Sequence, residues 1–308
     1  MRALASYIMR SRYHAMAVVA LCTALALFLP PLSYLSGAGV GLVALRHGPR
    51  QGLLVTLGAG LALGVLGAVL LGNPAPGVVF ALIIGLPLCL LAWLLRSTGS
   101  LGLALAMASL LGLLAVAGIH LLTADAAAAW RELLELVVRP ALEQSGAASD
   151  ARQIKQWLDE LAQMMTALLA TGLTLSLIIS LFIARWWQAM LYNPGGFKQE
   201  FHALRLSRHI ALPTVGVLAL ALLSQGELKQ FAAEVLAVLL VLYMIQGLAL
   251  VHRLVARLGA HLGWLIALYG AMLIALPQIG MVLAAAGFAD TWLNLRLRLG
   301  VANDNKRN

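Results

Sequence analysis

The residues of this sequence that could do chemistry are few, and none of them forms a recognised catalytic pattern. Its 7 histidines occur without the HxxxH or HExxH spacing that places two imidazoles on one helical face around zinc. The sequence also lacks a GxSxG nucleophile elbow and the glycine-rich GxxxxGK[ST] loop that binds nucleotide phosphates. We therefore expect no catalytic residue, no metal and no cofactor, and an enzyme is the least supported class of function.

Glu234 is the acidic residue that enters an apolar run most clearly. It falls about one helical turn into the predicted span Phe231–Val251, and the centres of the predicted spans contain no Asp, Glu, Lys or Arg. Ionisable groups inside a membrane commonly mark proton or ion pathways, so this pattern disfavours a proton-coupled pump. Two interpretations of Glu234 remain. It lies at the membrane interface near Lys229 and Gln230, the cheaper arrangement for a carboxylate, or it is a buried coupling carboxylate.

Several polar and aromatic residues are candidates for contact with a ligand at the outer membrane surface. Tyr34 lies at the end of the first predicted span, Asn73 lies in a Gly- and Pro-rich turn, and His120 lies at the end of another span. Asn73 can instead hydrogen-bond within its own turn, and His120 can bond a backbone carbonyl at the interface. Trp130 and Trp157 complete the candidates.

The elements that must position these residues are membrane-spanning helices. The sequence is 62% hydrophobic and 11% charged, with a mean hydropathy of +0.92, which excludes both an ordinary soluble domain and a disordered chain. Its long unbroken apolar runs are typical of helices rather than of barrel strands. The net charge of +9 arises from bases in short loops, so it indicates the positive-inside pattern and not nucleic-acid binding. We predict an all-α, multi-pass protein of the bacterial cytoplasmic (inner) membrane.

The number of spans depends on two short apolar runs. A bilayer core of about 30 Å needs about 20 apolar residues in a helix. The predicted full-length spans are Ala15–Leu35, Leu53–Leu71, Gly77–Leu95, Leu101–Leu122, Met164–Ala184, Phe231–Val251 and Leu262–Ala286. If Gly37–Leu45 and Ile210–Ser224 also cross, the bundle has about nine transmembrane helices, and about eight if the second run is re-entrant. Arg2, Arg10 and Arg12 place the N-terminus in the cytoplasm.

The segment 124–162 is predicted to be an amphipathic helical hairpin outside the cytoplasm. It holds many of the chain's acids, as an outer loop should, and its apolar residues keep helical period on both arms. Trp130 and Trp157 lie on the two apolar stripes, and Pro140 is expected to end or kink the first arm near Arg139. The hairpin either lies on the membrane surface or forms a lid over an outward-facing pocket.

A second amphipathic stretch is predicted on the cytoplasmic side. Phe197, Phe201 and Leu204 share one helical face that continues to Arg208, with Lys198 and Arg205 among its bases. The three bases Lys198, Arg205 and Arg208 can bind anionic lipid headgroups or can dock a protein partner.

Other residues have predicted structural roles. The pairs Gly37/Gly41 and Gly60/Gly64 have the GxxxG spacing of closely packed membrane helices. Asp290 is expected to pair with Arg296 or Arg298 and to fix the end of the last span, because an unpaired carboxylate there is costly.

The first half of the chain resembles the substrate-binding (S) components of energy-coupling factor vitamin transporters. The similarity rests on the run from Leu29 through a short Gly/Ala-rich helix to Gly48, Pro49 and Gly52, which match that family's Gly-Pro turn. The resemblance implies a six-helix substrate-binding half with both ends in the cytoplasm. It divides the chain into a half 1–187, which includes the hairpin, and a segment 188–308 with a three-span bundle.

The whole chain resembles the YybS-like family of bacterial membrane proteins. The similarity is carried by the stretches 201–208, 246–252 and 287–298, the last of which reads GFADTWLNLRLR. This resemblance implies a multi-pass membrane protein and specifies no chemistry.

Two classes of function remain. In the first, the protein binds or helps to transport a small, largely apolar ligand, held beneath the hairpin. In the second, it is a non-catalytic envelope assembly or scaffold protein that has other membrane proteins as partners. Membrane lipids are expected partners in either case.

Overall fold

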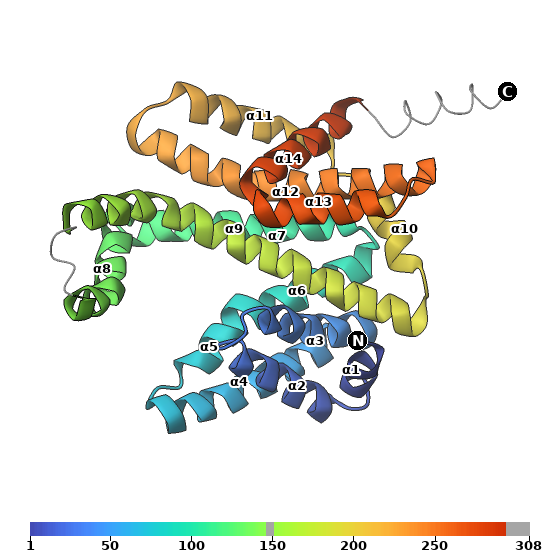
Figure 1. Ribbon diagram of the computed structural model, residues 1–308. Helices are drawn as coiled ribbons and strands as arrows, with labels where there is room; N and C mark the ends of the chain where they lie inside the picture. Colours follow the sequence, from blue (N-terminus) through green and yellow to red (C-terminus); the bar gives the residue numbers. More distant parts are fainter. Residues whose placement is uncertain (146–150, 294–308) are drawn as a thin grey trace. The chain divides into compact units, whose positions relative to one another are not determined.

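The computed structural model describes residues 1–145 and 151–293 of the 308-residue chain. Within those residues all regular elements are helical and no strand occurs, which confirms the predicted all-α class (Figure 1). The elements are α1 (Arg2–Ile8), α2 (Arg12–Leu25), α3 (Leu32–His47), α4 (Pro49–Leu71), α5 (Ala75–Phe80), the π-helical turn η1 (Ala81–Gly85), α6 (Leu86–Thr98), α7 (Leu101–Leu122), α8 (Ala126–Ser145), α9 (Ala151–Tyr192), α10 (Gly196–Ala203), α11 (Arg208–Leu223), α12 (Gly226–Leu258), α13 (Gly263–Ile274) and α14 (Leu276–Leu293).

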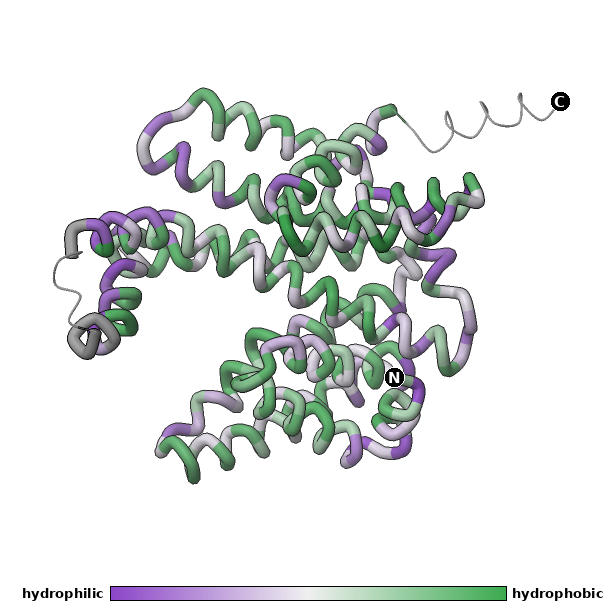
Figure 2. Tube along the Cα trace, viewed as in Figure 1, coloured by the Kyte–Doolittle hydropathy of each residue, from purple (hydrophilic) through white to green (hydrophobic). Residues whose placement is uncertain are grey.

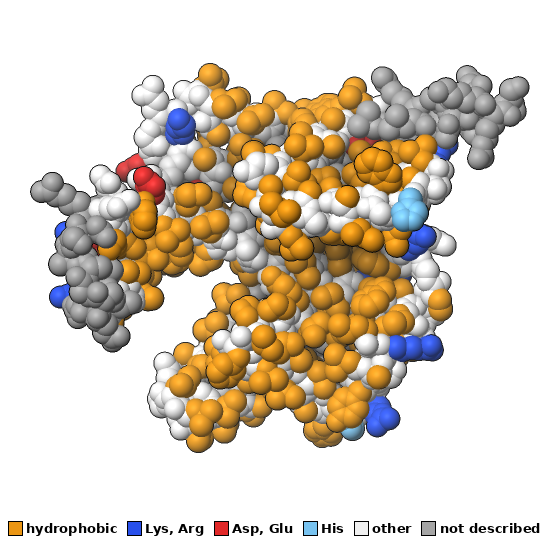
Figure 3. Space-filling model, in the orientation of Figure 1, with side chains coloured by type: hydrophobic (Ala, Val, Ile, Leu, Met, Phe, Trp, Pro, Cys, Tyr) orange, Lys and Arg blue, Asp and Glu red, His pale blue; other side chains and the backbone are white. Residues whose placement is uncertain are grey.

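Several of these helices are long and apolar enough to cross a membrane. In the described chain they number 5, namely Pro49–Leu71, Ala75–Thr98, Leu101–Leu122, Gln153–Tyr192 and Gly226–Leu258. The pair α10–α11, bent by 51°, raises the number to 6 if it is one span. Hydrophobic residues run along these helices (Figure 2) and cover most of the visible surface (Figure 3), which suggests contact with lipid. The predicted number of about eight to nine is larger because it counts shorter helices such as α2, α3 and α13.

The prediction of one span over Ala15–Leu35 is wrong. Helix α2 ends at Leu25, and a new helix, α3, begins at Leu32 after Pro30 and Pro31. A proline inside a helix lacks the amide hydrogen and clashes with the preceding turn, so two in succession favour a break. The residues after the break join the short run Gly37–Leu45, which makes α3 a helix of 16 residues.

Two further predictions, one about a span and one about a proline, are also corrected. The predicted span Leu262–Ala286 divides at Ala275, and Pro277 lies in the first turn of α14, where its missing amide hydrogen costs no helical bond. By contrast, α8 continues through Pro140 to Ser145 rather than ending near Arg139.

The described chain packs into two compact units, which we treat separately. Unit 1 comprises Met1–Ala108, Leu175–Ala211 and Leu242–Asn308, and unit 2 comprises Ser109–Thr174 and Leu212–Val241. The proposed division into residues 1–187 and 188–308 follows the expected topology instead, and it stays a prediction.

Helix α3 forms the core of the N-terminal part of unit 1. It packs against α2, α4 and α6, and every residue from Ser36 to Leu45 is buried. Its small residues allow this close packing: a Cβ on Gly37 would lie 2.8 Å from Ser180 Oγ, and one on Gly41 would lie 2.9 Å from Ala184 Cβ.

Unit 2 is built from parts of α7, α8, α9, α11 and α12. Val116, Ala170 and Val238 form its fully buried apolar cluster, with Leu113 and Phe231 packed against them. This cluster holds together the three helices that carry the polar residues of the candidate site.

Candidate functional site

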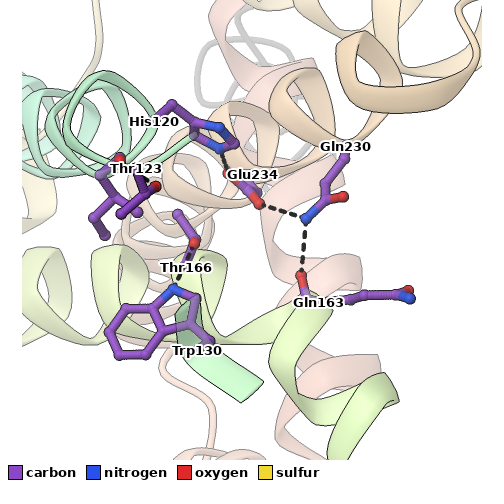
Figure 4. Close-up of polar contacts among 8 residues, drawn as sticks. His120, Thr123, Trp130, Gln163, Thr166, Gln230 and Glu234 are labelled. Carbon is purple, nitrogen blue, oxygen red and sulfur yellow. Dashed lines mark hydrogen bonds and ion pairs between the residues drawn. The ribbon is translucent and has the colours of Figure 1, made fainter. Parts of the chain in front are cut away.

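A polar cluster interrupts the apolar packing of unit 2 (Figure 4). His120 Nε2 on α7 lies 2.6 Å from Glu234 Oε2 on α12, and Gln230 Nε2 donates a hydrogen bond of 3.2 Å to Glu234 Oε1. The same amide group donates to the Gln163 carbonyl oxygen of α9 at 3.5 Å. The carboxylate therefore joins α7 to α12, Gln230 extends the contacts to α9, and both carboxylate oxygens have polar partners.

The predicted neighbours of Glu234 are confirmed for Gln230 but not for Lys229, and the predicted backbone partner of His120 is corrected. The Glu234 side chain is 3% exposed and contacts His120 and Gln230, with no contact to Lys229 shown among the described residues. His120 binds a side-chain carboxylate rather than a backbone carbonyl, and its side chain remains 29% exposed. The Glu234 carboxylate is thus buried in the protein, on a helix that is a candidate membrane span.

The two tryptophans of segment 124–162 have different surroundings. The Trp130 indole on α8 donates a 2.9 Å hydrogen bond to Thr166 Oγ on α9, and Thr166 is buried (Figure 4). Trp157 is 61% exposed. Arg131 of α8 also forms an ion pair with Asp159 of α9 at 2.9 Å. Only the first tryptophan therefore joins the polar residues of this unit.

Replacing Trp130 with Phe should destabilise the protein by about 1 kcal/mol, because the buried Thr166 hydroxyl loses its indole donor. The measurement is the free energy of unfolding in detergent, with Trp157→Phe as the matched control that should change it little. In a double-mutant cycle with Thr166→Val, strictly additive effects would show that the hydrogen bond does not contribute.

Unit 1 contains a large apolar cavity. Its volume is about 1290 Å³, and its walls come chiefly from α9, α10, α12 and α13. Phe182, Trp186, Phe201 and Tyr269 contribute aromatic side chains to the lining. Trp130 and Trp157, beneath which a ligand is predicted from the sequence, do not line this cavity.

His252 is the polar centre of the aromatic wall. Its Nδ1 lies 2.9 Å from the Leu248 carbonyl oxygen, and its Nε2 lies 3.2 Å from the Tyr269 hydroxyl. Because a carbonyl oxygen only accepts, Nδ1 carries the hydrogen, and in the neutral ring Nε2 accepts from Tyr269. The rings of Phe201 and His252 meet edge to face, with centroids 5.4 Å apart. The wall is therefore a connected set of aromatic rings with few polar atoms.

The remaining candidate ligand contacts lie elsewhere. Asn73 is exposed, and its Oδ1 accepts a 2.9 Å hydrogen bond from the Ala75 amide within the same turn. Tyr34 is half-buried in the first turn of α3. Neither residue lines the cavity of unit 1.

The prediction that Lys198, Arg205 and Arg208 belong to one amphipathic helix is wrong. Helix α10 ends at Ala203, and α11 begins at Arg208 after an irregular segment. Lys198 lines the cavity, whereas Arg205 donates to the Thr291 carbonyl oxygen at 3.3 Å. Glu200, on the same short helix, is held by an ion pair with Arg185.

The residues with predicted structural roles are placed as follows. Gly48 adopts a φ of +96°, Pro49 is the first residue of α4, and a Cβ on Gly52 would lie 2.7 Å from Ala44 Cβ. Asp290 is buried in α14, where its Oδ2 lies 3.4 Å from Gln246 Nε2. The predicted partners Arg296 and Arg298 lie outside the described residues. Among the described residues, no group of three or more His, Cys, Asp or Glu side chains could hold a metal ion.

The comparison with protein families agrees with this helical membrane architecture. A family model described as "Predicted membrane protein (DUF2232)" matches residues 15–291. The chain belongs to this family. Comparison with curated proteins and with solved structures gives no match.

Two structural features within the residues that match DUF2232 were not predicted from the sequence. The cavity wall around His252 and Tyr269 joins residues of α10, α12 and α13, which are separated along the chain. Gln246, fully buried in α12, hydrogen-bonds to both α14 and the segment before α11. A glutamine inside the apolar run 231–251 was the available signal for the second feature, because buried polar groups need partners.

Proposed function

We propose that this protein binds, as part of a transport-related role, a small amphipathic molecule in the cavity of unit 1. The observation that carries the proposal is the cavity itself, with its volume of about 1290 Å³ and its apolar, aromatic lining. Sites for small molecules are typically concave and mostly apolar, with a few placed polar groups, and they measure about 300–1,000 Å³. A cavity somewhat above this range suits a long apolar body. No catalytic step is proposed.

The charge of the cavity lining favours a ligand with an anionic head. Arg2 and Lys198 are the charged residues that line it, and among the described residues its lining includes no Asp or Glu. The other titratable residues of the lining are His202, His252 and Tyr269. An anionic headgroup gains about 1 kcal/mol for each nearby basic residue. We therefore commit to an anionic lipid as the occupant, with its acyl chains against the rings of α9, α10 and α13.

The topology that we propose places this cavity near the cytoplasmic side of the bacterial inner membrane. In it the N-terminus is cytoplasmic, about eight to nine helices cross, and segment 124–162 forms an outer amphipathic hairpin. The resemblance of residues 1–187 to S components of energy-coupling factor transporters supports a binding role. The resemblance to the YybS-like family supports the multi-pass arrangement.

The proposal is tested by counting retained lipids. Protein is purified in nanodiscs of phosphatidylcholine that contain a minor fraction of phosphatidylglycerol, and the lipids that remain bound are counted by native mass spectrometry. We expect selective retention of phosphatidylglycerol. Lys198→Gln should weaken it about fivefold, the equivalent of about 1 kcal/mol. Ala256→Trp, which places an indole in the cavity, should abolish it.

Each variant has a matched control outside the cavity lining. Ala267→Trp changes an exposed residue of α13, and Lys229→Gln removes an exposed base of α12 in unit 2. Both should retain phosphatidylglycerol like the wild type. Equal retention of the two lipids by the wild type, or retention that Ala256→Trp leaves unchanged, would contradict the proposal and favour the scaffold alternative.

A further inference from the structure

The pair formed by Glu234 and His120 in unit 2 joins a fully enclosed acid to a partly open base. The Glu234 side chain is 3% exposed, whereas that of His120 is 29% exposed, and 2.6 Å separates Oε2 from Nε2. Figure 4 shows the imidazole and the Gln230 amide on two sides of the carboxylate. A proton that reaches Glu234 from water can therefore travel through His120.

The groups that contact this pair from the neighbouring helices are neutral. Gln230 and Phe231 contact it from α12, and the ring centroid of Phe231 lies 5.3 Å from that of His120. The Gln163 carbonyl oxygen of α9 accepts a hydrogen bond from Gln230. The part of α11 in unit 2, Leu212–Leu223, contains no titratable side chain.

The other charged side chains described in unit 2 lie near helix ends, are engaged elsewhere or are exposed, as are Glu132, Arg139, Lys155 and Glu160. Asp125 follows α7, and Glu227 and Lys229 lie in the first turn of α12. Arg131 of α8 is paired with Glu135 and Asp159. Within the described part of unit 2, the shown contacts thus leave His120 as the cationic partner of Glu234.

Protonation decides the net charge that this enclosed site carries. With no shared proton, neutral imidazole faces carboxylate and the net charge is −1. With one proton, the pair is imidazolium and carboxylate, or imidazole and carboxylic acid, and the net charge is zero in both forms. Because net charge is costly in a medium of low dielectric constant, uptake of one proton removes the charge of −1 that the pair otherwise carries in this enclosed site.

We propose that Glu234 and His120 together form a proton-binding site. The site takes up one proton from water at the imidazole of His120, whose Nδ1 is the nitrogen not engaged with Glu234, and the hydrogen between His120 Nε2 and Glu234 Oε2 is then shared by the pair. On release one proton returns to water by the same route and leaves the pair with a charge of −1. Gln230 donates to Oε1 in either state and holds the carboxylate in place. An exchangeable proton on a candidate membrane span is the requirement for coupling to a proton gradient. This inference does not depend on the cavity in unit 1.

The experiment is pH-difference infrared spectroscopy of the full-length protein in nanodiscs, between about pH 4 and about pH 9, which brackets the ordinary Glu and His range. We expect a carboxyl carbonyl signal that changes with pH in the wild type and is lost in Glu234→Gln. His120→Gln should shift its midpoint. Glu227→Gln, the same change at an exposed residue of the same helix, should retain the Glu234 signal unshifted.

A second measurement needs no variant and so does not depend on the folding of Glu234→Gln. Dicyclohexylcarbodiimide, an apolar reagent, modifies protonated carboxyl groups, and peptide mass spectrometry locates the adduct. We expect an adduct on Glu234 whose yield rises as the pH falls. Coincident infrared difference spectra of wild type and folded Glu234→Gln, or a Glu234 that stays unmodified over the whole range, would overturn the proposal.

Discussion

Alanine at Gly247 or at Gly287 should separate α12 from α14 and abolish most of the folded protein. A Cβ on Gly247 would overlap the backbone carbonyl of Leu283, and a Cβ on Gly287 would overlap the backbone carbonyl of Tyr243. Overpacking against side chains costs about 1–3 kcal/mol when they can move aside. Here the obstacle is the backbone of the facing helix. We therefore expect a loss of at least about 3 kcal/mol, a large part of a typical stability of about 5–15 kcal/mol.

The measurement is the fraction of monodisperse protein after purification, together with the temperature of unfolding in detergent. Gly270→Ala is the matched control, because this glycine also lies in a helix of unit 1 but has no atom within 4 Å of an added Cβ. It should fold like the wild type. If Gly247→Ala and Gly287→Ala both unfold at the temperature of Gly270→Ala, the helices do not approach as closely as the structure has them.

The helical class and the tight packing of α3 could be predicted from the sequence, because they depend on local pattern. An apolar run of about 20 residues has few alternatives in a membrane, and a dense row of Gly and Ala favours close helix contacts. The spacing Gly37–Gly41 is visible within one helix. Gly247 and Gly287 lie on different helices and oppose one another only after folding, so no spacing rule identifies them.

The candidate site could be predicted only in part, because its residues come from different helices. His120 and Glu234 were each visible near the ends of apolar runs, and each had a sufficient local explanation. Their contact joins residues 114 apart in sequence, which local pattern does not determine. The break at Pro30 and Pro31 has a clear local signal, yet the apolar run across it favours one span. Pro140 is the opposite case, because the helix that it was expected to end or kink does not end there: α8 continues to Ser145.

Replacing Gln246 with Leu should destabilise the protein by roughly 3 kcal/mol. This side chain is fully buried in α12, and its Oε1 accepts a 2.9 Å hydrogen bond from the amide of Leu206 in the irregular segment before α11. Its Nε2 donates to the Gly287 carbonyl oxygen at 2.8 Å and to Thr291 Oγ at 3.1 Å on α14. Non-helical backbone in an apolar interior has no helical partner, so it depends on such side chains.

The expected loss follows from the groups that Leu cannot satisfy. Leaving the buried Leu206 amide without its acceptor costs about 1–3 kcal/mol, and each lost hydrogen bond to α14 adds a smaller amount, about 0.6 kcal/mol on average in membrane proteins. Unfolding is followed by circular dichroism as sodium dodecyl sulfate is added. Gln278→Leu makes the same change at an exposed residue of α14 and should leave the transition in place. A Gln246→Leu transition within about 0.5 kcal/mol of the wild type would mean that the segment 204–207 is held by other contacts.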